Sequence, residues 1–575
     1  MIPPVVKTGV RKASAVFPFI IFCFIFMPFA ARAQNIPPGD QPGAQGSRFQ
    51  SETKQEKKRL EKKQPQKPRI EIEQEKARPS EEPGPSFLLK NVKISGATVF
   101  QLRDLQPAYG RYIGTSVTFK DLEDIAAAIK ALYKKKGYLS TDAYIPEQDI
   151  AHGEVEIRVV EGKLGDVRVE GNKWFDASLL RKYIHIKKNE LLDIFKLQRD
   201  MLRLNQNPDL EVTAVVSPGT AQATTDIVLK VKDSLPYHAG INFDNQGTRL
   251  VGRSRTSAVL RSTNVTGLYD SLSINYLVSK DSCGEFISYL LPIGTYGTKA
   301  GIDLTFFDMK LGREYRDLGI TGTTRMMTPH VSRELYLSED YQAYADAGID
   351  IKSIEKRTAG ELNTNDEIRI LYAALDMAQI DRFWGGGQTV FSPRISVSTK
   401  HFLGASARNH PSASRQGTGG FFVKYEQSIR RTQRILFNSV ITARSQFQIA
   451  SHTLPSSEQI QLGGANSVRG YPEGEYLADM GGTLMGEWAF PRIIKPIQKY
   501  AYPVVFVDMA SGKLKKTGEG ERSNRFLMGA GAGIRVQVDR YFFLRMDWAK
   551  RVGLGDRPTH GQGPSTFYVT AQCEI

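Results

Sequence analysis

Residues 271–278 read SLSINYLV, a stretch that alternates apolar and polar side chains. From Leu272 onward every second residue is Leu, Ile, Tyr or Val, and the residues between them are Ser, Asn and Leu. Because successive side chains of a strand point to opposite faces, the pattern predicts a strand with one oily and one largely polar face. Such a strand fits a soluble sandwich with the oily face inside, or a membrane barrel with the oily face toward lipid.

The same alternation repeats through residues 236–575, for example in GIRVQV (533–538) and YFFLRMDWA (541–549). About sixteen such segments lie near residues 237, 255, 270, 284, 299, 326, 343, 367, 388, 420, 434, 481, 502, 527, 541 and 566. Their even number, and roughly 21 residues per strand with its connection, are typical of outer-membrane barrels. No apolar run in this region approaches the ~18 residues that a membrane helix needs. We therefore predict a 16-stranded antiparallel transmembrane β-barrel, whose closure leaves no open strand edge in lipid.

The amino terminus predicts export from the cytoplasm. A basic start is followed by an apolar core over about residues 15–29 and by Ala-Arg-Ala ending at Ala33, which together are typical of a secretory signal. A membrane anchor is the alternative, but Pro28 interrupts the apolar run. We expect a signal peptide over 1–33 and a location in the outer membrane of a Gram-negative bacterium.

Composition excludes several functional classes. Beyond the signal only Cys283 and Cys573 remain, so no disulfide framework is expected. The formal net charge of +16 is dispersed along an exported chain, which argues against nucleic acid as a partner. The sequence contains no G-x-S-x-G, H-E-x-x-H, C-x-x-C or phosphate-loop motif. We expect no catalytic residue, no cofactor and no metal.

Residues 34–86 form a polar segment with eleven Lys or Arg and nine Asp or Glu, too polar to bury a core. Within it, residues 51–64 (SETKQEKKRLEKKQ) have helix-forming composition and stop before Pro65. The segment is predicted to be a linker with a short helix over 51–64. Either a flexible tether or a helix that occupies a pore fits this composition.

Two small α+β modules follow, over 87–162 and 163–235. In the first, TFKDLEDIAAAIKALYKKKG (118–137) predicts a helix that begins after Thr118 and ends at Gly137. GEVEIRVVEG (153–162) predicts an alternating strand. The second module has a similar order of elements, so the tandem suggests binding rather than catalysis.

Three stretches of these modules carry a family resemblance: YKKKGYLSTDAYIPEQDI (133–150), GEVEIRVVEGKLGDV (153–167) and LNQNPDLEVTAVVSPG (204–219). They resemble the paired POTRA domains of two-partner secretion transporters, the TpsB family of haemolysin and adhesin exporters. The resemblance implies POTRA 1 over 87–162, POTRA 2 over 163–235 and a barrel over 236–575.

Residues 462–476, LGGANSVRGYPEGEY, place one arginine in a loop-like stretch between two predicted strands. They match the VRGY motif that this family carries on a long loop folded into the barrel, here about 452–480. The matching residues are Val468, Arg469, Gly470 and Tyr471.

The family also carries an inward F-x-D on a later strand, and AYPVVFVDMASG (501–512) supplies Phe506 and Asp508. Strand parity independently places Asp508 toward the lumen, with Val505 and Val507 toward lipid. A guanidinium can bind a carboxylate with two hydrogen bonds, so we expect Arg469 to pair with Asp508. Glu487 has lumen parity and could join this network, or it could be a general lumen acid.

The resemblance implies a pore that exports one large partner exoprotein without ATP, with POTRA domains that recognise the unfolded cargo at a sheet edge. Tyr183 and Leu204 of the second module are candidate cargo contacts, although core positions are the alternative for both. The other expected partners are outer-membrane lipid and, during biogenesis, barrel-assembly machinery. The last strand, STFYVTAQCEI (565–575), suits such machinery, but Ile575 departs from the aromatic end typical of the family.

Two other functions remain open from the sequence. A barrel insertase or assembly factor would share the POTRA-and-barrel plan but more often has more POTRA modules. A passive porin or receptor would lack the periplasmic tandem.

Overall fold

The computed structural model describes residues 36–61, 69–72, 86–150, 152–491, 500–518, 521–538, 541–559 and 563–574. The predicted signal peptide (1–33) and the terminal Ile575 lie outside these residues. No helix in the described ranges is long and apolar enough to cross a membrane.

The polar segment contains a helix longer than predicted. After a short 3-10 turn, η1 (Pro38–Asp40), helix α1 spans Pro42–Glu61 and so begins at Pro42 rather than Ser51. Pro and Gly residues in the first turns argue against a helix, but two of the glycines allow close packing. A Cβ atom on Gly43 would lie 2.8 Å from the Ser456 hydroxyl, and one on Gly46 would lie 2.5 Å from Thr324. Tertiary contact therefore explains the early start.

The first α+β module packs two helices on a small sheet. Its sheet has the order β3-β6-β5, in which β3 and β6 are parallel. Thr118 caps α3 as predicted and forms a capping box with Asp121, while Gly137 follows the helix with φ +97°. The elements are β2 Phe87–Leu88, β3 Asn91–Ser95, α2 Leu102–Tyr109, η2 Gly110–Tyr112, β4 Ser116–Val117, α3 Phe119–Lys135, β5 Asp142–Tyr144 and β6 Glu154–Val160.

The second module has a four-stranded sheet of order β1-β8-β9-β7. Strand β1 (Ile70–Ile72) comes from the polar segment and pairs in parallel with β8, an addition that the sequence pattern does not predict. The other elements are β7 Lys163–Glu170, α4 Ala177–Lys182, α5 Ile194–Leu204, β8 Leu210–Pro218 and β9 Thr224–Asp233.

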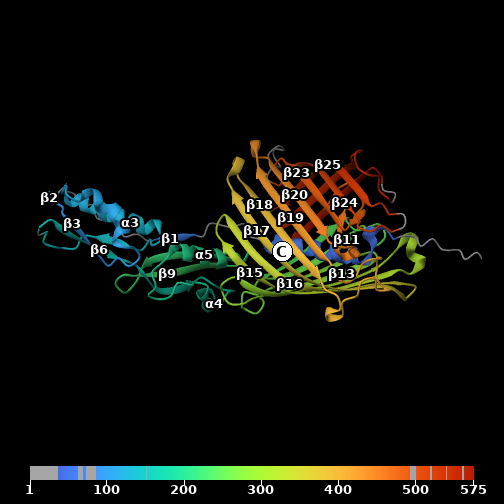
Figure 1. The fold of residues 1–575 in the computed structure, drawn as a ribbon, viewed down its shortest axis with the longest axis horizontal. Helices are drawn as coiled ribbons and strands as arrows, with labels where there is room; N and C mark the ends of the chain where they lie inside the picture. The colour runs from blue at the N-terminus through green and yellow to red at the C-terminus, as the bar shows by residue number, and fades with distance from the viewer. Residues whose placement is uncertain are drawn as a thin grey trace, which may run out of the picture. The chain divides into compact units, whose positions relative to one another are not determined.

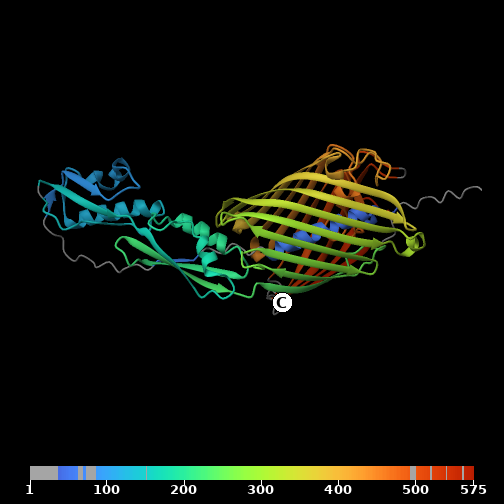
Figure 2. The same cartoon turned by 90° about the horizontal axis from the view of Figure 1, so that it is seen from below.

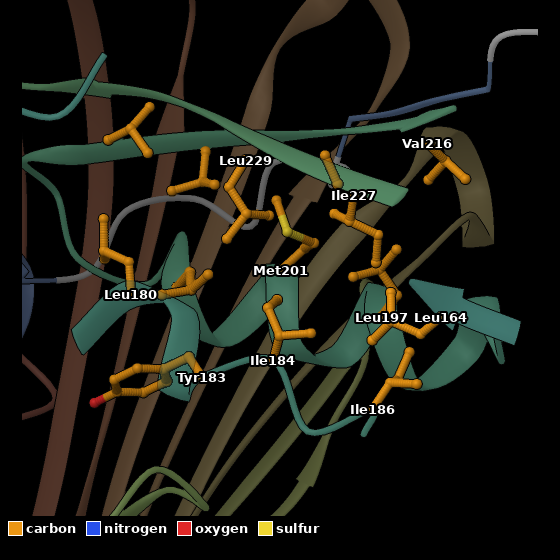
Figure 3. Packing of buried hydrophobic residues seen from close by; sticks show 14 of the residues in the cluster. Leu164, Leu180, Tyr183, Ile184, Ile186, Leu197, Met201, Val216, Ile227 and Leu229 are labelled. Atoms are coloured by element: carbon orange, nitrogen blue, oxygen red, sulfur yellow. The ribbon is translucent and has the colours of Figure 1, made fainter. Parts of the chain in front are cut away.

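Figure 3 shows the core of this second module, where side chains from α4 and α5 meet the sheet. Tyr183 and Leu204 belong to this core and retain 4% and 0% exposure. The hydroxyl of Tyr269, on the barrel, donates a hydrogen bond to the Leu204 carbonyl. Both candidate cargo contacts are thus packing residues, the alternative that the sequence left open, because their side chains are closed off from solvent.

The predicted 16-stranded barrel is confirmed. Its strands run in chain order, all neighbours are antiparallel, and β10 pairs with β27 to close it. Figure 1 shows the barrel and labels several of its strands, among them β15, β18 and β24. The strands are β10 Tyr237–Asp244, β11 Arg255–Ser262, β12 Ser271–Ser279, β13 Ser282–Pro292, β14 Thr298–Lys310, β15 Thr321–Leu337, β16 Tyr341–Thr358, β17 Glu361–Asp381, β18 Gly387–Ser398, β19 Val423–Arg434, β20 Val440–Ala450, β23 Met480–Ala489, β24 Ala501–Lys513, β25 Asn524–Val538, β26 Phe542–Arg551 and β27 Ser565–Glu574.

The two faces of the alternating stretch 271–278, now part of β12, have the predicted exposure. On β12, Ser273 and Asn275 are each 3% exposed, whereas Tyr276 and Val278 on the opposite face are 51% and 44% exposed. The polar side chains are therefore inside the barrel and the apolar ones outside. This is the arrangement of a barrel in lipid.

Two segments fill much of the lumen. Helix α1 packs against β13, β14, β15 and β16, and is visible inside the barrel in Figure 2. The connection between β20 and β23 folds inward and contains η7 (Ser456–Glu458) and a hairpin of β21 (Ile460–Leu462) and β22 (Tyr476–Ala478). We call residues 452–479 the lumen loop. The remaining short helices are η3 Arg313–Leu318, η4 Phe383–Gly385, η5 Phe402–Gly404 and η6 Leu436–Asn438.

Candidate lumen site around Arg469

Arg469 lies at the tip of the lumen loop and is 1% exposed. Its Nε and Nη2 donate to the two oxygens of Asp508 on β24, at 2.7 and 2.9 Å. Its backbone amide donates to the same carboxylate at 3.2 Å. The guanidinium also lies 3.3 Å from the centre of the Phe506 ring. The Arg469 guanidinium and the Asp508 carboxylate thus form a bidentate pair, a geometry that arginine can make and lysine cannot.

Two further carboxylates contact the same guanidinium. Nη1 of Arg469 lies 3.1 Å from Glu487 on β23 and 3.2 Å from Asp547 on β26. Arg535 bridges these two acids at 2.6 Å each, and Arg545 contacts Asp547 at 2.7 Å. Three arginines therefore face three carboxylates, and the buried charges balance.

Sequence reasoning did not identify Arg535, Arg545 or Asp547 as members of this site. Strand parity already indicated that the charged face of β26 points to the lumen. It could not show which strands lie beside the tip of the loop, because that depends on how the loop folds.

Gly470 and Tyr471 fix the backbone beside Arg469. Gly470 has φ +97°, a left-handed conformation that glycine adopts most readily. Its amide donates to the Tyr568 hydroxyl at 3.1 Å, and that hydroxyl donates to the Tyr471 carbonyl at 3.0 Å. The Tyr471 hydroxyl in turn donates to the Asp556 carbonyl at 2.9 Å. Val468 is fully buried beside them.

Strand β25 makes room for the tip of the loop with glycines on its lumen face. A Cβ atom on Gly529 would lie 2.0 Å from the Arg469 carbonyl oxygen. One on Gly531 would lie 2.6 Å from the Phe506 ring. Side chains at these positions would push the loop and the ring off the wall.

A second set of ion pairs holds the start of the lumen loop. Glu458 in η7 is 4% exposed and contacts Lys352 on β16 at 2.6 Å and Lys424 on β19 at 2.8 Å. Near the other end, the fully buried Asp479 accepts from Arg415 at 3.1 Å and from the Lys515 amide at 2.8 Å. The loop is thus fastened at its two limbs as well as at its tip.

Helix α1 contacts both the lumen loop and the wall. Gln461 of the loop donates to the Ala44 carbonyl at 2.7 Å, and Arg48 lies 3.3 Å from Glu473. Toward the other end of the helix, Lys54 pairs with Asp303 on β14 at 2.9 Å and Lys58 with Asp376 on β17 at 2.8 Å. Polar contacts of this kind can be exchanged for contacts with water more easily than an apolar core.

The second module contacts the barrel at a strand and at a turn. Arg203 on α5 pairs with Glu334 on β15, with Nε at 3.1 Å from the carboxylate. His185 lies 2.9 Å from the Thr295 hydroxyl in the β13–β14 turn. Within the described residues, no group of three His, Cys, Asp or Glu is arranged to hold a metal ion.

A 16-stranded barrel with a charge-paired loop in its lumen, preceded by two α+β modules, defines a class of outer-membrane transport proteins. Residues 223–536 match the family described as haemolysin secretion/activation protein ShlB/FhaC/HecB. Residues 87–162 match the ShlB-type POTRA domain.

The chain belongs to this family. It is therefore a two-partner secretion transporter that resides in the outer membrane, has periplasmic POTRA domains and exports a partner exoprotein. The family comprises transport pores rather than enzymes.

Individual relatives agree with this assignment. The heme/hemopexin transporter protein HuxB of Haemophilus influenzae is 23% identical over 489 residues, which are 81% of this chain and 84% of HuxB. The outer membrane transporter CdiB of Escherichia coli is 23% identical over 525 residues, 89% of this chain and 87% of CdiB.

Two solved structures share the fold. One of CdiB from Escherichia coli has a TM-score of 0.72 at 20% identity and covers 94% of this chain and 99% of its own. A structure of BamA from Haemophilus ducreyi lacking POTRA domains 1–3 has a TM-score of 0.51 at 15% identity, and covers 85% of this chain and all of its own.

Proposed function

We propose that this chain exports one large, unfolded exoprotein through the barrel lumen without ATP or any enzymatic step. The observation that carries the proposal is the filling of the lumen by polar contacts. Helix α1 and the lumen loop are held by ion pairs and hydrogen bonds such as Lys54–Asp303 and Arg469–Asp508. A pore filled this way can open by exchanging ion pairs, without unfolding its wall.

In this proposal α1 is a plug rather than a tether. Its first half is buried between the loop and the wall, whereas Lys58 and Arg59 near its end are exposed. The exposed end would leave first, and the cargo would follow the vacated path. The closed state then prevents leakage between rounds of export.

Arg469 acts in the proposal as the latch of the lumen loop. Its ion pairs reach three strands of the wall, β23, β24 and β26. The tip of the loop therefore links these three strands near the end of the chain. Val468, Gly470 and Tyr471 position the latch, Phe506 and Asp508 receive it, and Glu487 completes its charge balance.

Cargo recognition is assigned to the sheet edges of the POTRA modules. The pairing of β1 with β8 supports this, since the second module accepts an added strand at that edge. Because Tyr183 and Leu204 are buried, we assign recognition to backbone groups at the edge rather than to these side chains.

The experiment compares cells with and without the gene. We expect one large exoprotein to disappear from the medium of the deletion strain and to return on complementation, while other outer-membrane barrels stay at normal levels. Loss of many barrels from the membrane would instead favour an insertase, and an unchanged medium would refute the proposal. We further propose that barrel-assembly machinery inserts this chain and that outer-membrane lipid surrounds it; nucleic acid is not an expected partner.

A further inference from the structure

Two arginines of the barrel wall face the lumen without an acidic partner. Arg430 on β19 and Arg444 on β20 are directly paired across the two strands. Lys424 and Gln448 have the same parity on these strands and contact Glu458 of the lumen loop, so this face points inward. In the part of the chain that the structure describes, neither arginine makes an ion pair.

The lumen is open at this level. Arg430 and Arg444 are exposed, whereas Lys424 and Gln448, farther along the same strands, are only 5% and 3% exposed beneath the lumen loop. Arg430 lies near the end of β19 that leads into the turn before β20, the side on which the POTRA domains contact the barrel. Both guanidiniums are therefore accessible from the periplasmic mouth while α1 stays in place.

The local charge is unbalanced. No Asp or Glu occurs in residues 428–434 of β19 or 440–446 of β20. The nearby Glu487 is already engaged by Arg469 and Arg535. The charged groups that act most strongly on Arg444 are three arginines, Arg430, Arg545 and Arg469, and one acid, Glu487.

Like charges directly opposite each other on neighbouring strands destabilise a sheet. An anion between Arg430 and Arg444 would remove that cost, and a carboxylate could accept two hydrogen bonds from either guanidinium. The flanking Ser428 and Gln446 share the inward face and could bind the backbone of an extended chain.

We propose that Arg430 and Arg444 form a docking surface for an acidic, extended segment of the exported protein as it enters the lumen. The inference rests on the proposed export function and adds the chemistry of the segment that the wall accepts. The surface is reached before α1 has left, so it holds cargo at the mouth of a closed pore.

The binding test uses the full chain in detergent and fluorescein-labelled decaglutamate, followed by fluorescence anisotropy. We expect saturable binding that weakens with added KCl, since salt screens exposed charges. In Arg430→Gln/Arg444→Gln the Kd should rise about tenfold, equivalent to about 1.4 kcal/mol. Arg431→Gln is the matched control, because Arg431 lies on the opposite face of β19 and pairs with Asp381 at 2.9 Å.

Equal affinity of the wild type and the double variant would overturn the proposal, as would equally tight binding of decalysine. Heat-modifiable mobility in gels checks that each barrel is folded. If the double variant does not fold, the binding site is instead mapped by cross-linking a photoreactive decaglutamate to the wild-type protein. Cross-links within 428–446 are expected, and cross-links confined to other segments would refute the surface.

Measuring the amount of secreted exoprotein distinguishes a failure of the docking surface from a failure of the proposed export function. Arg430→Glu/Arg444→Glu should lower the amount of exoprotein in the medium well below that of Arg431→Glu. If gene deletion removes the exoprotein but the charge reversal exports as the wild type does, the docking surface is wrong and the export function stands. If gene deletion changes nothing in the medium, the export function itself is wrong.

Discussion

At the scale of single residues, Arg469 connects the lumen loop to the wall through a buried and balanced set of charges. Breaking one member of a buried ion pair commonly costs about 3–5 kcal/mol, because the partner keeps its charge without compensation. Asp508 is fully buried and takes two hydrogen bonds from the guanidinium, so it should be the most sensitive partner.

We predict that Arg469→Ala and Asp508→Ala each lower the free energy of unfolding of the barrel by about 3–5 kcal/mol. The double variant should lose clearly less than the sum, since both changes remove the same contact. Urea unfolding in detergent measures the stability, and secretion of the exoprotein measures the function. Additive losses would mean that the two residues act independently.

Arg357→Ala provides the control for this pair. Arg357 pairs with Glu355 on β16 at 3.0 Å, but the two side chains are 46% and 33% exposed. A surface pair of this kind contributes about 0–1 kcal/mol. A loss as large as that of Arg469→Ala would show that burial is not the cause of the effect.

The pairing of Arg469 with Asp508 could be anticipated from the motif resemblance and from strand parity. Asp547 and Arg535 could not, because they are 78 and 66 residues from Arg469 along the chain. Their contact depends on where the loop tip comes to rest, and the glycines of β25 leave room for that position. The sequence shows those glycines but not that a loop covers them.

At the scale of elements, a buried carboxylate organises the first POTRA module. Glu161 follows β6 and accepts hydrogen bonds from the Thr98 and Val99 amides and from the Tyr133 hydroxyl, at 2.7, 2.9 and 2.7 Å. Burial alone would raise the pKa of Glu161, but these hydrogen bonds and that of the Thr98 hydroxyl outweigh it and lower the pKa below its usual value near 4.5.

A lowered pKa means that ionised Glu161 stabilises the folded module at neutral pH. This contribution is present above the unfolded pKa and is lost as pH falls through the lowered folded pKa. We predict that Glu161→Gln reduces the hydrogen-exchange protection of residues 91–160 at pH 7. In the wild type this protection should fall as the pH drops below about 4.5, and in the variant the fall should be smaller. Glu154→Gln, at the exposed start of β6, should leave protection unchanged. Identical pH profiles for Glu161→Gln and the wild type would contradict the assignment.

The ion pair between Lys54 of helix α1 and Asp303 of the wall allows a test of whether α1 plugs the lumen. Lys54 pairs with the 9% exposed Asp303 side chain, whereas the adjacent Gln55 is exposed. Lys54→Ala leaves Asp303 without this contact, so we predict a several-fold longer open time of the full chain in planar bilayers. Gln55→Ala should conduct as the wild type does. Equal open times for the two variants would mean that this ion pair does not hold the plug.

The elements also show where sequence patterns stop being informative. The capping residues of α3 were predicted because capping is local, and Thr118 needs only Asp121 beside it. The start of α1 and the strand β1 were missed because each forms only against another element. Gly43 and Gly46 favour no helix by themselves, and residues 70–72 are too few to form a strand without the edge of β8.

At the scale of the whole molecule, most of the barrel could be predicted from alternation alone. Fifteen of the sixteen expected positions lie inside the corresponding barrel strand or within three residues of its start, because lipid outside and water inside impose one pattern on every strand. The position near 434 is the exception, since Arg434 ends β19 and β20 begins at Val440. The occupants of the lumen could not be predicted in the same way. Nothing in the composition of residues 42–61 indicates whether they lie in solvent or in a pore.

Export through the lumen is tested most directly by finding which face of the wall the exoprotein touches in transit. Gln446 and Phe447 are neighbours on β20 with opposite orientation; Gln446 faces the open part of the lumen, and Phe447 is 44% exposed on the lipid side. A photoreactive amino acid at position 446 should capture the exoprotein in transit, while the same group at position 447 should not. Capture from position 447 and not from position 446 would contradict export through the lumen.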